Sequence, residues 1–179
     1  MTEHTGENCA PEAFIPLEGG QRMPLPGNTL PIYLQEGACP PVTGYQNDLG
    51  LDLCSPEDIH IEPGGSYAVD LLLSVYIPEL PAPMSDMFHV GGLVWPKSGH
   101  TFRASMETGG GVIDPGYTDN IKVKLYNHGK DPIDFKRGAK VAQLILMLCM
   151  KVGKVQVMDE PLDRAAERGK RGFGSQGTY

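Results

Sequence analysis

The sequence has no apolar run long enough to cross a membrane. A membrane-spanning helix needs about 18 or more consecutive apolar residues, and no such run occurs among the 179 residues of the chain. The N-terminus also lacks the short apolar stretch of a secretory signal. The four cysteines, at positions 9, 39, 54 and 149, form no CxxC pair and have no histidine at metal-finger spacing. We therefore expect an intracellular protein in a reducing compartment, with no membrane partner.

Positive charge is scarce relative to negative charge. Fifteen Lys and Arg stand against 22 Asp and Glu, which gives a formal net charge of −7. A surface with this balance does not attract the phosphate backbone of nucleic acid, so no nucleic-acid partner is expected. If the substrate is an anion, the cations that bind it have to be local. Lys97 and the basic C-terminal tail are the candidates.

Helix signals are also few, because residues that break helices are frequent. Sixteen prolines and 23 glycines favour short strands joined by turns. Strands are expected at residues 31–34, 50–54, 67–76, 89–95, 112–113, 121–126, 133–135 and 141–150. Only residues 98–106 resemble a helix, and the three prolines within residues 78–87 indicate a loop. This pattern predicts an all-β fold, a sandwich or barrel, with one short helix.

Two of the expected strands carry patterns that predict their surroundings. Within residues 121–126, Ile121, Val123 and Leu125 alternate with polar or aromatic residues, so one face should be buried and the other exposed. Residues 141–150 are too apolar for an exposed strand, and they form either a central core strand or a subunit contact. Gln143, within this run, needs a polar partner.

Five short segments carry candidate chemistry, and the first two contain Asp52 and Ser98. Segment one, Gly50-Leu51-Asp52-Leu53, sets a carboxylate between two leucines, where it either serves a site or simply faces solvent. Segment two, Pro96-Lys97-Ser98-Gly99, follows a strand and precedes the expected helix. The hydroxyl of Ser98 and the backbone N–H groups beside it could bind a phosphate, or Ser98 could be only a helix N-cap.

Segment three, residues 109–117, reads Gly-Gly-Gly-Val-Ile-Asp-Pro-Gly-Tyr. Three glycines let the backbone approach a ligand and offer its N–H and C=O groups to the edge of a flat polar base. Asp114 stands at the end of this strand, where it could orient a water, and Tyr117 could form a wall against a sugar ring. A glycine-rich hairpin alone would not need the isolated acid.

The last two segments supply an amide and a set of hydrogen-bond donors. In segment four, Lys140-Val141-Ala142-Gln143-Leu144-Ile145, the amide of Gln143 could donate to a phosphate. Segment five is the tail, residues 168–177, with four glycines, one Phe, one Ser and three cations. The tail has almost no apolar side chain to bury, so it is either a floppy basic tail or a segment that closes over a ligand.

In this order and spacing, the five segments resemble the trimeric dUTP pyrophosphatase (dUTPase) family. The resemblance runs from residue 30 to residue 177, and it is most specific at Gly111-Val112-Ile113-Asp114-x-x-Tyr117, at Val141-Ala142-Gln143-Leu144-Ile145 and at Arg168-Gly169-x-x-Gly172-Phe173-Gly174-Ser175. It implies a jelly-roll-like β domain at residues 29–160 and a C-terminal lid arm at 161–179. Residues 1–28 show no sustained hydrophobic period, so they are expected to form a mobile N-terminal arm. It also implies a homotrimer in which one chain supplies segments one, two and four of each site. A second chain supplies segment three, and a third lends its tail.

The reaction that this resemblance implies is hydrolysis of dUTP to dUMP and pyrophosphate, with Mg²⁺ on the triphosphate. Asp114 would activate the water that attacks the α-phosphorus. Tyr117 would stack under the deoxyribose and leave no room for a 2′-hydroxyl. The backbone of Gly111, Val112 and Ile113 would pair with the edge of the uracil.

The resemblance assigns the phosphates, the metal ion and the closing of the site to other residues. Asp52 would reach the Mg²⁺ through its water shell. Phosphate oxygens would be held by Lys97, Ser98, Gly99 and Gln143. From the tail, the binding residues would be Arg168 and Ser175 at the γ end, Phe173 over the uracil ring, and Gly174.

The sequence departs from the family pattern in several places. Lys97 stands where Arg is usual, and it keeps the charge but loses the bidentate fork. His100 stands where an apolar residue is common, and Arg171 and Gln176 replace a Gly and a Thr of the tail. Residues 78–87 resemble an insertion, which with the long N-terminal arm favours a divergent, viral member. The alternative function is a binding or regulatory protein on the same scaffold that has reduced or lost turnover. It would contact a protein partner through the arm or the 78–87 loop.

Overall fold

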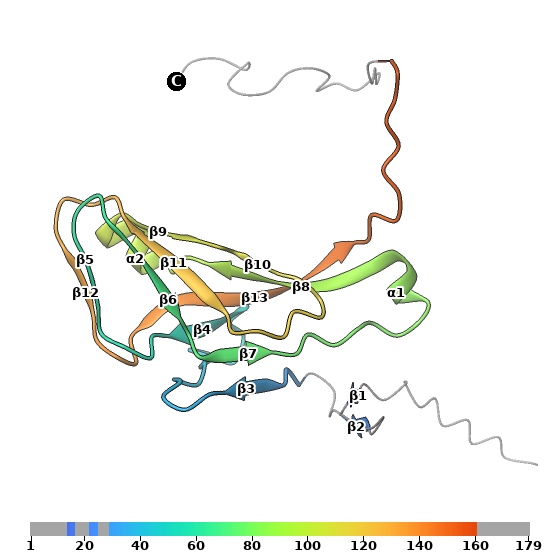
Figure 1. Ribbon diagram of the computed structural model, residues 1–179, viewed down its shortest axis with the longest axis horizontal. Helices are drawn as coiled ribbons and strands as arrows, with labels where there is room; N and C mark the ends of the chain where they lie inside the picture. The colour runs from blue at the N-terminus through green and yellow to red at the C-terminus, as the bar shows by residue number, and fades with distance from the viewer. Residues whose placement is uncertain (1–13, 17–21, 25–28, 161–179) are drawn as a thin grey trace, which may run out of the picture.

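Two antiparallel β-sheets form the body of the computed structural model, which describes residues 14–16, 22–24 and 29–160 (Figure 1). The first sheet has four strands in the order β10 (Val112–Ile113), β8 (Phe88–Trp95), β13 (Lys140–Met150) and β4 (Gly50–Cys54). The second has three strands in the order β6 (Ser66–Asp70), β11 (Lys122–Asn127) and β9 (Met106–Gly109).

One continuous apolar cluster holds the two sheets together. The four-stranded sheet contributes Leu53, Val94 and Leu144, and the three-stranded sheet contributes Val69 and Leu125, all of them buried. Burial of an aliphatic side chain of this size stabilises a fold by about 1.5–3 kcal/mol. The core therefore fixes how the strands that carry the candidate segments lie relative to one another.

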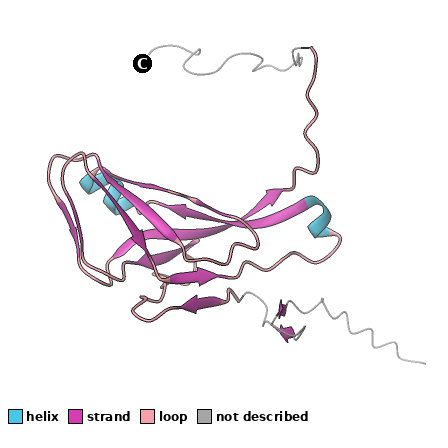
Figure 2. Cartoon of the chain, in the orientation of Figure 1, coloured by secondary structure: helices cyan, strands magenta, loops and turns pink. Residues whose placement is uncertain are grey.

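Three two-stranded pairs accompany these sheets. β5 (Ile59–Ile61) pairs with β12 (Ile133–Phe135), β3 (Ile32–Leu34) with β7 (Leu73–Val75), and β1 (Phe14–Pro16) with β2 (Arg22–Pro24). The β1–β2 pair lies within the segment expected to be an arm, and the rest of residues 1–28 lies outside the described part of the chain. Figure 2 shows that strands and loops make up nearly all of the described chain. These observations confirm the predicted all-β fold.

Helix occurs at two places in the described chain, where the sequence predicts one. α2 (Ser98–Ala104) confirms the expected helix, but it ends before residue 106 because Ser105 takes a left-handed conformation with φ 50°. α1 (Met84–Met87) lies within residues 78–87, so the prediction of a loop throughout that segment is wrong. The helix begins directly after Pro83, and a proline suits a helix start, where its missing N–H is not needed. Neither helix is long and apolar enough to cross a membrane.

The strand expected at residues 67–76 is in fact two strands in different sheets. β6 pairs with β11, whereas β7 pairs with β3. The break lies at Leu72, which has φ 55° and whose N–H donates to the Asp70 carboxylate at 2.9 Å. This short polar contact stabilises a backbone conformation that few non-glycine residues adopt.

The structure confirms the alternating pattern of the first informative strand, and it confirms a core position for the second over its first half. In β11 and the residue before it, Ile121, Val123 and Leu125 are at most 1% exposed. β13 lies between β8 and β4 and is buried in its first half. Its second half is exposed, and the chain beyond it leaves the body of the domain (Figure 1). β13 is thus a central core strand at one end and an exposed apolar strand at the other.

Candidate functional site

Segments one, two and four meet around the carboxylate of Asp52. One Asp52 oxygen accepts a hydrogen bond from the ammonium group of Lys97, and the other lies 2.8 Å from the ammonium nitrogen of Lys140. Asp52 is 6% exposed, whereas both lysine side chains reach solvent. The sequence left open whether Asp52 faces solvent or belongs to a site, and the structure places it within a cluster of charges.

Burial and the two lysines act on the pKa of Asp52 in opposite directions. Burial alone would raise it, but the hydrogen bonds from Lys140 and Lys97, together with their positive charges, outweigh this effect and hold the pKa below its ordinary value. The hydrogen bond with Asp52 in turn raises the pKa of Lys140. Asp52 is therefore ionised at neutral pH, and with two lysines beside it the cluster keeps an excess of positive charge.

Gln143 belongs to the same row of side chains as Asp52. The register of the sheet sets Gln143 opposite Asp52 on β4 and opposite Trp95 on β8, so the three side chains share one face. The Gln143 amide donates to the carbonyl oxygen of Pro96 at 3.0 Å, which is the polar partner that the sequence required. A Cβ at Gly50 would collide with the Gln143 amide oxygen, so this glycine leaves room for the amide.

Segment two forms the start of α2. Lys97 is extended, with φ −82° and ψ 129°, and occupies the N-cap position. Ser98 is therefore the first helical residue and not the N-cap, and both Ser98 and Gly99 are exposed. A Cβ at Gly99 would meet nothing within 4 Å. Packing within this chain does not explain the glycine, which leaves open space next to the charged cluster.

His100 ties α2 to the start of β13. Its Nε2 lies 2.7 Å from the carbonyl oxygen of Lys140. Its ring packs edge-on against Phe135, with 5.1 Å between the ring centroids. This histidine thus combines a packing contact with a hydrogen bond.

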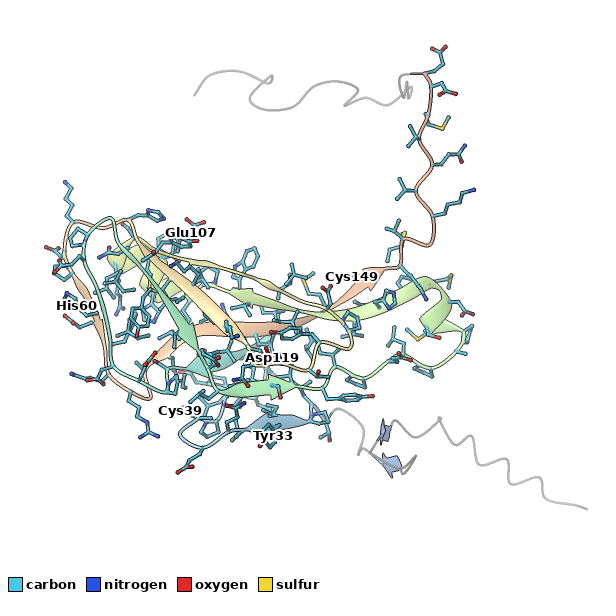
Figure 3. The ribbon with its side chains drawn as sticks, viewed as in Figure 1. Tyr33, Cys39, His60, Glu107, Asp119 and Cys149 are labelled. Atoms are coloured by element: carbon cyan, nitrogen blue, oxygen red, sulfur yellow. The ribbon has the colours of Figure 1, made fainter. Side chains whose placement is uncertain are left out.

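The two strands of the glycine-rich hairpin belong to different sheets. β9 pairs with β11, and β10 pairs with β8. The strands therefore diverge, and a hollow of about 330 Å³ lies between β9 and the ends of β8 and β10. Its lining includes Trp95, Glu107, Thr108, Gly111 and Val112. Figure 3 marks Glu107 on the β9 side.

The lining of this hollow contains an unsatisfied polar atom and a tight backbone contact. The Thr108 hydroxyl is buried and has no hydrogen-bond partner among the described residues, although buried hydroxyl groups ordinarily have one. The carbonyl oxygen of Gly111 accepts the N–H of Val94 at 2.7 Å, and a Cβ on Gly111 would lie 3.0 Å from the carbonyl oxygen of Val94. A side chain at Gly111 would crowd β8, so glycine suits the place where the hairpin meets this strand.

Asp114 and Tyr117 lie in the exposed turn that follows β10. The N–H of Tyr117 donates to the carbonyl oxygen of Asp114 at 3.1 Å, and Gly116 has φ 83°. Pro115 and Gly116 thus occupy the central positions of a tight turn that favours this pair of residues. The hydroxyl of Tyr117 donates to the carbonyl oxygen of Asn120 at 3.0 Å. A second hollow, of about 220 Å³, separates Pro115 from part of the 78–87 segment.

The two groups of candidate residues are far apart within one chain. Ile113 lies opposite Gly92 on β8, whereas Gln143 lies opposite Trp95. Asp114, one residue beyond Ile113, is therefore displaced from the Gln143 row by about four residues, or about 13 Å along the strands. The structure brings segments one, two and four together and holds Asp114 of segment three apart from them, whereas Gly111 of the same segment contacts Val94, next to Trp95.

Lys140 lies in the charged cluster and Thr108 lines the first hollow, and the sequence assigned no role to either residue. The adjacent apolar residues Val141 and Ala142 interrupt strand alternation, which was a signal of an irregular strand next to Lys140. Nothing in the sequence pointed to Thr108. The expected tail residues lie outside the described part of the chain: Arg168, Phe173, Gly174 and Ser175.

Comparison with known proteins identifies the family of this chain. A family model described as dUTPase matches residues 38–177. The chain belongs to the dUTPase family. A relative from Candida glabrata, named deoxyuridine 5′-triphosphate nucleotidohydrolase, is 32% identical over 154 residues, which cover 86% of this chain and 99% of the relative. The protein of the same name from Yarrowia lipolytica is 35% identical over 145 residues, covering 81% and 86%.

A solved structure confirms the fold of this dUTPase-family chain. The dUTPase of Staphylococcus bacteriophage 80alpha, solved with dUpNHpp, matches with a TM-score of 0.69 and 22% sequence identity. The match covers 84% of this chain and 99% of the phage chain. At this level of identity the likeness establishes the fold.

Asp52 is the one residue of this family member that was expected to contact a metal ion. Within residues 14–16, 22–24 and 29–160, no three His, Cys, Asp or Glu side chains gather closely enough to hold a metal ion. Mg²⁺ keeps several waters and is commonly bound by one or two carboxylates together with phosphate oxygens. A single carboxylate such as Asp52 fits an ion that arrives on a triphosphate.

Proposed function

We propose that this protein hydrolyses dUTP to dUMP and pyrophosphate. The proposal is carried by one observation, the meeting of Asp52, Lys97 and Gln143 on one face of a sheet whose edge strand belongs to a glycine-rich, open hairpin. The charged group suits a triphosphate, and the hairpin suits a flat base. The relatives of this family member from Candida glabrata and Yarrowia lipolytica are named for this reaction.

The triphosphate binds at the charged cluster. Lys97 makes charge-assisted hydrogen bonds to phosphate oxygens, and the Ser98 hydroxyl and the Gln143 amide donate to others, with Gly99 leaving space beside them. Asp52 contacts the Mg²⁺ through water. When bound, this ion neutralises part of the phosphate charge, which is how a protein with a net charge of −7 can bind a triphosphate.

The nucleoside binds at the hairpin. The backbone of Gly111, Val112 and Ile113 pairs with the edge of the uracil, and the unpartnered hydroxyl of Thr108 in the adjoining hollow supports a polar ligand at this place. Tyr117 stacks against the deoxyribose, and 40% of its surface is exposed for this contact. A 2′-hydroxyl would be excluded by the ring.

Asp114 acts as the general base of the reaction. Its carboxylate takes a proton from a water while the water oxygen forms a bond to the α-phosphorus. The bond from the α-phosphorus to the oxygen that bridges to the β-phosphorus breaks, and pyrophosphate leaves. Asp114 lies in an exposed turn, so its carboxylate is accessible to a substrate.

The complete site is shared between the chains of a homotrimer. One chain holds Asp114 about 13 Å along the strands from the Gln143 row, so the base that acts on a phosphate bound at this row comes from a neighbouring copy. A third copy closes the site with its tail. The tail residues in this role are Arg168, Phe173, Gly174 and Ser175.

The test is release of pyrophosphate from dUTP with Mg²⁺, measured beside dCTP, dTTP and UTP at equal concentration. We expect rapid release from dUTP alone. Release from all four nucleotides would contradict the proposed base and sugar recognition. Binding of dUTP without release would contradict the enzyme and favour the alternative, a binding protein on the same scaffold.

A further inference from the structure

The ammonium group of Lys140 lies in the charged cluster, although the function proposed above gives it no role. We propose that Lys140 is a second phosphate-binding cation of the site, and that a β-bulge at Val141 orients it. The inference rests on the proposed function and adds a residue to the part of the site that binds the triphosphate.

β13 has a one-residue irregularity directly after Lys140. Ala142 lies opposite Leu53 on β4, but the next pair joins Lys140 to Cys54. Val141 is therefore an extra residue on β13, which makes a β-bulge. Val141 and Ala142 are both fully buried, whereas a regular strand turns neighbouring side chains to opposite faces.

The bulge turns Lys140 toward the face that carries Asp52. Side chains two residues apart on a strand share a face, so Cys54 and Asp52 lie on the same side of β4. Lys140 is paired with Cys54 and so joins that side. In an unbulged strand the pairing would slip by one residue, and Lys140 would point to the opposite face. The distance of 2.8 Å between the Lys140 ammonium nitrogen and the Asp52 carboxylate agrees with this orientation.

Contacts within the chain hold Lys97 and Lys140 next to each other before a ligand binds. These contacts involve both their main chains and their side chains. Lys97 precedes α2, and His100 in the first turn of this helix lies 2.7 Å from the carbonyl oxygen of Lys140. Asp52 joins the two ammonium groups, one on each carboxylate oxygen. Two cations are thus presented as a pair with little freedom to lose when a ligand binds.

The Lys97–Lys140 pair can donate further hydrogen bonds, and it carries more positive charge than Asp52 neutralises. A lysine ammonium group has three donors, and Asp52 is the one acceptor seen for the ammonium group of Lys140 among the described residues. The Lys140 side chain is 44% exposed, against 26% for Lys97. Asp52 brings one negative charge for two cations, so the cluster attracts further negative charge, and a triphosphate supplies it.

The experiment compares two ligands, dUpNHpp and deoxyuridine, which differ in the phosphates. In the full-length protein, Lys140→Met should weaken binding of dUpNHpp by about 10- to 100-fold through loss of a charge-assisted hydrogen bond and leave binding of deoxyuridine unchanged. Lys140→Arg keeps the charge and should retain most of the affinity. Lys136→Met is the matched control, because Lys136 forms a similar pair with Asp58, at 2.7 Å, outside the cluster.

Two results would overturn the inference. One is unchanged binding of dUpNHpp by a folded Lys140→Met protein. The other is an equal loss of affinity for both ligands with a lower unfolding temperature, which would show that Lys140 only supports the fold around Asp52. Hydrolysis of dUTP by the wild-type protein is measured in parallel. An active wild type with an unaffected variant refutes only the role of Lys140, whereas a wild type that neither binds dUpNHpp nor hydrolyses dUTP refutes the proposed function as well.

Discussion

Gln143 lies directly opposite Asp52 on the paired strands β13 and β4, and its amide also donates to the carbonyl oxygen of Pro96. Side chains in such a pair have Cβ atoms about 4.5–5.5 Å apart, so the amide and the carboxylate can act on one ligand. The same amide links β13 to the loop that carries Lys97. Two strands and the start of α2 therefore form one preorganised unit, which is the arrangement that a phosphate site needs.

Gln143→Glu should disrupt this unit electrostatically. The substitution sets a second carboxylate opposite Asp52, where like charges repel, and it competes with phosphates for Lys97. We expect binding of dUpNHpp to weaken by at least about tenfold. Gln143→Met, a neutral variant of similar size, should lose less affinity. Calorimetric titration of both variants provides the measurement, and equal affinities for the two would argue against a phosphate at this position.

Asp114→Asn should separate binding from chemistry. The amide keeps the shape of the side chain but cannot take the proton from water, so we expect kcat to fall by about 10²- to 10⁴-fold while dUpNHpp binds as before. Asp119→Asn, in the same exposed stretch of chain, is the matched control. Near-normal turnover by Asp114→Asn would show that another group is the base.

Gly111→Ala should damage the hairpin where it joins β8. The new Cβ would lie 3.0 Å from the carbonyl oxygen of Val94, so the strand must shift and the hollow next to it changes shape. We expect a raised KM for dUTP and a lower unfolding temperature, with a cost of about 1–3 kcal/mol. Gly153→Ala, where a Cβ would meet nothing within 4 Å, is the control. Wild-type kinetics for Gly111→Ala would mean that the backbone here does not contact the base.

The sequence predicted strand burial correctly where apolar and polar residues alternate regularly along the chain. The alternation of Ile121, Val123 and Leu125 needs only one buried face, and the structure confirms it. The break at Leu72 could not be predicted, because three consecutive leucines have no period. The short helix after Pro83 was also missed, because the prolines of that segment indicated only a loop.

The candidate site was predicted in its parts but not in its geometry. Asp52, Lys97 and Gln143 could be named from their segments, yet their meeting depends on the register of three strands that are distant in the chain. The direction of Lys140 depends on a bulge, which is a property of strand pairing and not of one strand. The divergence of β9 from β10 likewise follows from the partners that each strand takes.

His60 should make stability depend on pH at one end of the domain. His60 is labelled in Figure 3. Its Nδ1 lies 2.7 Å from Asp134 and its Nε2 lies 3.2 Å from Glu62. The hydrogen bond with Asp134, followed by that with Glu62, raises the pKa of His60 above its ordinary value. A histidine whose pKa is higher in the folded than in the unfolded chain stabilises the fold below the unfolded pKa. This contribution disappears as the pH rises through the folded pKa.

His60→Gln should therefore lower the unfolding temperature more at about pH 6 than at about pH 9, on either side of the histidine range. His89→Gln, away from these two carboxylates, should show no such difference. Thermal unfolding of both variants across this range is the measurement, and titration of the His60 ring by NMR checks the direction of the pKa directly. Equal losses at both pH values for His60→Gln would contradict the double pairing.

Sharing of the site between chains predicts that two inactive variants can restore each other. A chain without residues 168–179 lacks the lid, and Asp114→Asn lacks the base, so each alone should have little turnover while both remain trimers by light scattering. In a trimer that contains both, a site that takes Asp114 from a truncated chain and the tail from an Asp114→Asn chain is complete. Co-refolding equal amounts should restore activity to roughly a quarter of the sites, if the chains mix at random in a closed ring. Mixing without refolding is the control, and no recovery after refolding would mean that each site draws its base and its lid from the same chain.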